Sequence, residues 1–107
     1  LVRSIHKYLL DNISQRITID EMARKYLINP TTLKSVFKAV YGTSIASHIK
    51  EHRMKFAARL LMETPKSIKE IAKEVGYESQ SKFSKAFKEY YDVLPTEYRI
   101  FHSNKLK

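Results

Sequence analysis

The chain lacks several features that would define other protein classes. It has no cysteine, which excludes disulfides and thiolate metal sites and suits a reducing cytosol. No apolar run is long enough to span a membrane, and residues 1–10 lack the order of a secretion signal. Glycine and proline are scarce, with two and three residues, and no alternating β-branched run is present. The remaining pattern is helical throughout and predicts an all-α protein.

Acidic residues are also scarce relative to basic ones. The 107 residues include 20 Lys and Arg against 11 Asp and Glu, so the net charge is +9. With 43% hydrophobic residues the chain can bury a core, which argues against disorder. The excess of positive charge favours a polyanionic partner, either nucleic acid or an anionic membrane surface. The lysines are spread over several predicted helices rather than gathered opposite one apolar face, which favours nucleic acid.

The sequence contains an internal repeat, in which residues 17–42 match residues 66–92. Ala23 and Ala72 match at an offset of 49 positions, whereas the Phe-Lys pair farther along matches at an offset of 50. The second copy therefore has one extra residue in its turn. Each copy predicts a short helix, a tight turn and a second helix, which is the helix-turn-helix plan.

Both copies begin with the pattern of a capping box. Thr18 and Ser67 are each followed three residues later by a glutamate, Glu21 or Glu70. In such a box the hydroxyl accepts a hydrogen bond from the first turn, and the glutamate reaches back to the cap residue. Both short helices are therefore predicted to begin at these residues.

The rest of the chain completes a fold of two helix-turn-helix subdomains joined by a long linker helix, with about seven helices. The other predicted elements are a first helix from about Val2 to Ile13, a long helix from Ser44 to Thr64, a last helix from about Pro95 that includes Tyr98 and Ile100, and a frayed tail, Ser103–Lys107. The long helix, at about 18 residues, would span roughly 27 Å. The predicted boundaries are 1–50 and 65–102 for the subdomains, 44–64 for the linker helix and 103–107 for the tail.

The apolar spacing predicts which side chains these helices bury. In the first helix they are Ile5, Leu9 and Ile13, and in the long helix Ile45, Ile49, Met54, Ala57, Ala58, Leu61 and Met62. In the second helices of the repeat they are Leu33, Val36 and Phe37, then Phe83, Ala86, Phe87 and Tyr90. The outward residues are Thr31, Thr32, Lys34, Ser35 and Lys38 in the first copy, and Gln80, Ser81, Lys82, Ser84, Lys85 and Lys88 in the second.

This outward chemistry suits contact with DNA. The second helix of a helix-turn-helix lies in the major groove with its N-terminal part against base edges. A glutamine can pair with adenine, a lysine can donate to guanine, and serine or threonine can serve either base. The two second helices are therefore predicted to read bases at their start and to hold phosphates farther along.

Several different short motifs are distributed along nearly the whole chain, from about Ile5 to Ile100. They are Ala23, Leu33, Phe37-Lys38, Tyr41-Gly42, Arg53, Ala57, Leu60-Leu61, the run IKEIAKEVGYESQSKF at 68–83, Phe87-Lys88 and PTEYR at 95–99. Together they resemble the AraC/XylS type of bacterial transcription regulators. The resemblance implies a domain that inserts two recognition helices into successive major-groove segments of promoter DNA.

The resemblance also implies roles for particular residues. The base-reading positions fall on Thr31, Lys34, Ser35, Gln80, Ser81 and Lys85. We expect phosphate contacts from Thr32, Lys38, Lys82 and Lys88. The expected partners are double-stranded promoter DNA and RNA polymerase, and the expected location is the bacterial cytoplasm. Since the chain begins at Leu1 rather than Met, an effector or dimerisation domain is expected to precede it. No enzymatic activity, cofactor or metal is expected.

Two residues depart from the family pattern. Leu27 stands in the first turn, where the family usually has glycine, and Asp92 stands where glycine often ends the second recognition helix. A left-handed backbone costs a leucine roughly 1–2 kcal/mol, which predicts that the first turn is reshaped. Asp tolerates that conformation better. Neither residue lies on a predicted reading face.

Three other interpretations compete with binding to duplex DNA. His48 and His52 fit an H-x-x-E-H pattern and share a helix face, but no third metal ligand is evident, since His6 and His102 are isolated in the sequence. Recognition of single strands or RNA would need exposed aromatic platforms, and only Tyr77 lacks a clear core position. A helical protein–protein interaction module stays open as the rival function.

Overall fold

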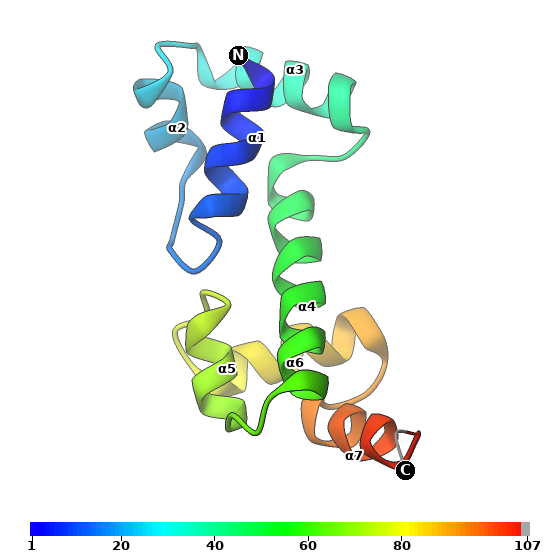
Figure 1. Ribbon diagram of the computed structural model, residues 1–107. Coiled ribbons are helices and arrows are strands. Elements are labelled where there is room, and N and C mark those ends of the chain that lie inside the picture. The colour runs from blue at the N-terminus through cyan, green and yellow to red at the C-terminus, as the bar shows by residue number, and fades with distance from the viewer. Residues whose placement is uncertain (106–107) are drawn as a thin grey trace. The chain divides into compact units, whose positions relative to one another are not determined.

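The structure, a computed structural model, describes residues 1–105 and the side chains of residues 1–102. The described residues form seven α-helices and no strand, which confirms the predicted fold class. The helices are α1 (Val2–Asp11), α2 (Ile19–Lys25), α3 (Pro30–Tyr41), α4 (Ile45–Glu63), α5 (Ile68–Glu74), α6 (Gln80–Tyr91) and α7 (Pro95–Lys105) (Figure 1).

The chain divides into two compact units, and the division lies inside α4. The first unit is Leu1–His52 and the second begins at Arg53. In the first unit α1 and α2 both pack against α3, and in the second α5 and α7 both pack against α6. In each unit the second helix of the repeat is thus the element against which the others assemble.

Each unit has its own apolar core. The buried residues of the first are Ile5, Leu9, Met22, Ala23, Leu33, Phe37 and Ile45. Those of the second are Met54, Ala57, Ala58, Leu60, Leu61, Ile71, Ala72, Val75, Phe83 and Phe87. The three buried phenylalanines come from the two repeat helices α3 and α6, so these helices supply the largest side chains of both cores.

The caps explain where the short helices begin. The Thr18 hydroxyl accepts a hydrogen bond from the backbone N–H of Glu21 at 3.1 Å. At Ser67 the predicted capping box is complete, because the backbone N–H of Ser67 also donates to Glu70 at 3.3 Å. At Thr18 the structure shows only the hydrogen bond to the hydroxyl and no complete box. The predicted capping box is therefore confirmed for α5 and wrong for α2.

The prediction of a reshaped first turn is wrong. Leu27 adopts the left-handed conformation with φ 53°, as Gly76 does in the second turn with φ 96°. The turns also share a hydrogen bond, in which Ile28 N–H donates to Ala23 O in one and Tyr77 N–H donates to Ala72 O in the other, both at 2.9 Å. The packing of α2 against α3 therefore fixes the backbone of the turn, and Leu27 adopts the left-handed conformation despite its cost.

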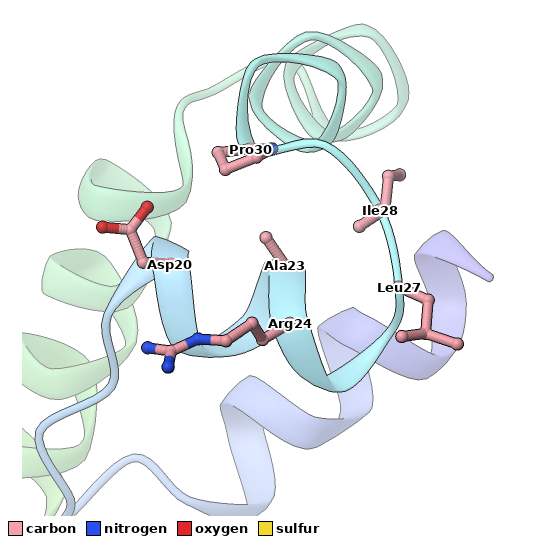
Figure 2. A pocket seen from close by; sticks show the side chains of 6 residues that line it. All are labelled: Asp20, Ala23, Arg24, Leu27, Ile28 and Pro30. Atoms are coloured by element: carbon pink, nitrogen blue, oxygen red, sulfur yellow. The ribbon is translucent and has the colours of Figure 1, made fainter.

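Figure 2 shows how this first turn is built. The small side chain of Ala23 points toward Pro30 at the start of α3, and Ile28 lines the same hollow. Leu27 points away from both and is 94% exposed. The leucine thus gains almost no burial in return for its backbone strain.

Three other predictions need correction. The first helix ends at Asp11, so Ile13 lies in the following turn and is half-buried. Met62 is 42% exposed, because it lies at the edge of the α4 stripe, whereas Leu60 is buried. Ile49 is half-buried rather than buried. The frayed tail at 103–107 stays a prediction: α7 includes residues 103–105, and residues 106–107 lie outside the described part of the chain.

Candidate nucleic-acid interface

The two repeat helices begin at caps that fix the position of their first turns. The Asn29 side chain accepts from the backbone N–H of Thr31 at 2.8 Å, and Pro30 takes the first helical position. The Ser79 hydroxyl accepts from the backbone N–H of Lys82 at 3.1 Å. Both helices are 12 residues long, so the capped starts present equivalent first turns.

All ten predicted DNA-contacting residues are exposed on these helices. In α3 they are Thr31, Thr32, Lys34, Ser35 and Lys38, and in α6 they are Gln80, Ser81, Lys82, Lys85 and Lys88. The structure brings together five of them in each unit, on the sides of the helices that the cores leave open. Each set combines hydroxyl or amide groups in the first turn with lysines farther along, which is the arrangement that the sequence predicted.

The prediction is wrong for four side chains at the edges of these faces. Val36 and Tyr90, predicted to be buried, are 40% and 39% exposed. Ala86, predicted to be buried, and Ser84, predicted to face outward, are both half-buried. A helical stripe indicates the centre of the buried face, but the neighbouring helices decide how wide that face is. These corrections leave the ten candidate contacts unchanged.

The equivalent positions of α3 and α6 differ in chemistry. The one-residue insertion lies at Glu78, ahead of the cap, so the helices align at an offset of 50. Thr31 then corresponds to Ser81, and Lys38 to Lys88. Pro30, however, corresponds to Gln80. The first position of α3 has no side-chain hydrogen-bonding group, while that of α6 has an amide.

The electrostatics favour an anion at both helix starts. Neither α3 nor α6 has an acidic residue in its first turn. Asn29 and Ser79 cap N–H groups of these turns, but no carboxylate within either turn neutralises the positive end of the helix dipole. Lys82 Nζ lies 3.3 Å from the Glu78 carboxylate, but both side chains are well exposed, so this ion pair is weak and its amine can turn to a phosphate at small cost.

Tyr77, which has no clear core position in the sequence, packs beside Phe83 and Arg53 in the structure. Its ring lies 5.7 Å from that of Phe83, and the Arg53 guanidinium lies 5.8 Å from its centroid. Burial raises the pKa of Tyr77 and lowers the pKa of Arg53, although each group opposes the other's shift. Tyr77 therefore packs the second turn against α4 and is no stacking platform for single strands.

Other polar groups of the second unit also hold its framework. Arg99, in the PTEYR motif, donates to Leu61 O at 3.1 Å and to Thr64 O at 3.2 Å, and so caps the end of α4. Hydrogen bonds from Ser67 lower the pKa of Glu70. Burial, with Tyr98 and Tyr90 nearby, raises the pKa of Tyr91. The sequence did not indicate this role for Arg99, because the two carbonyl groups that it contacts lie 35 and 38 residues away along the chain.

The prediction that His6 is isolated, with no third ligand for His48 and His52, is wrong. The structure places His6 Nε2 2.8 Å from His48 Nε2. The three histidines form one cluster in the first unit, away from the predicted reading residues in sequence.

Comparison with known proteins decides the family. A family profile described as "Helix-turn-helix domain" matches residues 22–100, which is most of the chain. The chain belongs to the AraC family of helix-turn-helix DNA-binding domains. The resemblance stated from its motifs is thereby confirmed.

The relatives of this AraC-family domain are transcription regulators. The virulence regulon transcriptional activator VirF of Yersinia enterocolitica is 32% identical over 96 residues. That match covers 90% of this chain but 35% of VirF, so the chain spans about a third of that relative's length. The C-terminal domain of AraT, a response regulator from Geobacillus stearothermophilus, has 36% identity and a TM-score of 0.90, and the match covers 94% of this chain and 84% of that one.

A third comparison shows the same fold on DNA. The DNA-binding domain of AdpA, a global transcriptional factor solved in complex with a target DNA, has a TM-score of 0.91 over 97% of this chain and 94% of that one. At 18% identity this likeness shows the fold alone. Since the AraC family consists of transcription regulators, the domain is a DNA-binding module and not an enzyme. In the described part of the chain, no helix is long and apolar enough to cross a membrane.

Proposed function

We propose that this domain regulates transcription by binding duplex DNA with α3 and α6 in two successive major-groove segments. The observation that carries the proposal is the repetition of one device. Each unit has a capped 12-residue helix that buries phenylalanine on one side and exposes hydroxyls, an amide or lysines on the other. A chain with two such helices can contact two segments of the major groove of duplex DNA, whereas one helix would be enough for a single segment.

The base contacts are assigned to the first turns and the residues one turn beyond. In α6, Gln80 can pair with adenine, and Ser81 and Lys85 lie four residues apart and so share a face. In α3, the equivalent groups are Thr31 and Ser35, with Lys34 beside them. These residues would distinguish one base sequence from another.

The phosphate contacts are assigned to residues at the margins of the same faces. Lys38 and Lys88 lie in the last turns of their helices, and Thr32 and Lys82 lie in the first turns. Contacts of this kind fix the position of the protein on the duplex without reading its sequence. They would give the complex a steep dependence on salt concentration.

The rival function is a helical protein–protein module. Interfaces between proteins are usually anchored by buried aromatic or arginine side chains and are poor in lysine at their centres. The ten candidate contacts on α3 and α6 have the opposite composition, with five lysines and no aromatic or arginine side chain, so they favour DNA. As VirF is named a transcriptional activator, we further infer that RNA polymerase is a partner of the full-length protein. We also propose that the full-length protein has an effector or dimerisation domain ahead of this one and that it acts in the cytoplasm.

The test is the salt dependence of duplex DNA binding, measured by fluorescence anisotropy. If about 6–9 phosphates are neutralised, log K should fall with log[salt] with a slope of roughly −5 to −8. Lys88→Ala should reduce that slope by about one, on cognate and random DNA alike. Lys7→Ala on α1 removes the same charge and is the matched control, with an unchanged slope expected.

Footprinting tests whether both helices dock. Successive major-groove segments recur about every 34 Å on one face of DNA, so protection is expected over two such segments. Protection confined to a single half-turn would contradict two-helix docking. A flat salt response, or equal binding to duplex DNA and heparin, would favour the protein–protein module.

A further inference from the structure

The first unit contains a cluster of three histidines that the DNA-binding function does not use. His6 comes from α1, and His48 and His52 lie one turn apart on α4. The ring centroids lie 4.7 Å apart for His6 and His48, 4.5 Å apart for His48 and His52, and 6.3 Å apart for His6 and His52. One ring nitrogen from each residue lies within 4.8 Å of the others. Three nitrogen atoms therefore converge on one point between two helices.

The surroundings hold these rings in place. Tyr41, at the end of α3, stacks on His6 with centroids 4.4 Å apart, and Phe37 meets His48 edge-on at 5.3 Å. His48 is 9% exposed and is the one buried polar residue in the described part of the chain. His6 and His52 are half-buried, so the cluster has a packed side and a side open to solvent. A buried imidazole among aromatic rings needs a polar partner, and His6 Nε2, at 2.8 Å from His48 Nε2, is one such partner.

The geometry fits a small divalent metal ion with nitrogen ligands. Zn²⁺ binds imidazole nitrogen at about 2.0–2.1 Å in tetrahedral sites, which sets two ligand atoms roughly 3.4 Å apart. The 2.8 Å between the His6 and His48 nitrogens is shorter than this spacing, and the 4.8 Å limit for the cluster is longer. Small rotations of the side chains would therefore bring all three nitrogens to ligand distance. Imidazole suits zinc, copper and nickel, whereas magnesium and calcium prefer oxygen ligands.

We propose that His6, His48 and His52 bind one Zn²⁺ ion, with the fourth position open to water. In the metal-bound state the rings of His6, His48 and His52 each turn a lone pair to the ion, and the proton that joins the Nε2 atoms of His6 and His48 moves to a Nδ1 atom or is released to water. The ion would join α1 to α4 within the first unit, next to Tyr41 and Phe37 of the recognition helix α3. Metal binding would thus stabilise the unit that presents α3, and the proposal is independent of the DNA contacts.

The experiment is titration of Zn²⁺ alone into the untagged chain, followed by calorimetry. We expect one ion per chain and a higher melting temperature for the first unit. His52→Gln removes a ligand at a half-buried position and should weaken binding by about 100-fold or more, since loss of a group that only hydrogen-bonds to a metal ligand already costs about 10–100-fold. His102→Gln, on α7 in the second unit, removes the remaining histidine and should leave both affinity and stoichiometry unchanged.

Two further measurements make the result decisive. Circular dichroism of His52→Gln must show wild-type helix content, and if it does not, His6→Gln replaces it as the ligand variant. Co²⁺ should give the visible absorption of a tetrahedral site in the wild type and in His102→Gln, and lose it in the ligand variant. The proposal is overturned if Zn²⁺ gives no binding when well in excess of protein, or if His52→Gln and His6→Gln both bind like the wild type. In that case the cluster is a hydrogen-bonded and stacked packing element only.

Discussion

The two helix-turn-helix units share a backbone plan but place glycine at opposite ends of it. Each unit has two left-handed residues, one in the turn and one after the second helix. The first unit uses Leu27 and Gly42 there, with φ of 53° and 75°, and the second uses Gly76 and Asp92, with φ of 96° and 65°. The comparison shows that the fold sets the dihedral angle and that residue type sets only its cost.

The reading faces differ in a similar way. The same position holds Pro30 in α3 and Gln80 in α6, so the first helix starts with rigid backbone and the second with a side chain that can read a base. The units are therefore alike in how they present a helix and unlike in what that helix offers. We expect the second unit to contribute more sequence preference than the first.

The largest effect on stability should come from removing a buried phenylalanine from one of the two cores. Phe37 and Phe87 are both fully buried, each in its own unit, so replacement by alanine should cost roughly 3–5 kcal/mol in the unit that carries it. Hydrogen exchange of backbone amides measures the units separately. Phe37→Ala should lower protection in α1–α3, and Phe87→Ala should lower it in α5–α7. Equal loss in both units for either variant would show that the cores are not independent.

A smaller effect is expected at the end of α3. A Cβ on Gly42 would meet no atom within 4 Å, so the cost of Gly42→Ala is that of the backbone alone, about 1–2 kcal/mol. Gly42→Asn should lose less, because asparagine tolerates the left-handed region as Asp92 does in the second unit. Chemical denaturation of the three proteins checks this order. Equal loss for alanine and asparagine would assign the cost to something other than φ.

The smallest effect is a gain at Leu27. Its side chain is 94% exposed, so little packing is lost in Leu27→Gly. Relief of backbone strain contributes about 1–2 kcal/mol, and the larger conformational freedom of glycine in the unfolded chain costs about 0.4–1 kcal/mol. The expected net gain is therefore roughly 0–1.6 kcal/mol, with a central value of about 0.8 kcal/mol. Gly76→Leu, the reverse change in the second turn, should destabilise. Denaturation midpoints measure both, and a loss with Leu27→Gly would mean that the leucine makes a contact worth more than its strain.

Local signals predicted much of this molecule from sequence. The cap residues Thr18 and Ser67 predicted the starts of α2 and α5, because a cap bonds residues two or three positions away. The spacing of Phe83 and Phe87 indicated the buried face, and the outward residues followed from it. The roles assigned to those outward residues stay predictions until DNA binding is measured.

The errors arose where distant contacts decide. The burial of Val36 and Tyr90 depends on how far neighbouring helices extend over the face, which no single-helix pattern contains. The local cost of a left-handed leucine predicted a reshaped turn, yet helix packing held Leu27 in place. His6 meets His48 across 42 residues, so the histidine cluster was visible only once the fold brought α1 to α4.

The most direct test of the account is selection of binding sites from a random pool of duplex DNA by the wild type and by Gln80→Ala. If α6 reads bases through Gln80, the variant should lose preference at one base position, with a cost of about 1–3 kcal/mol on the wild-type site and nearly unchanged non-specific affinity. Gln15→Ala, at the other glutamine of the chain and ahead of α2, is the matched control and should recover the wild-type consensus. If Gln80→Ala recovers that same consensus with the same stringency, Gln80 does not read bases and the assignment of the α6 face is contradicted.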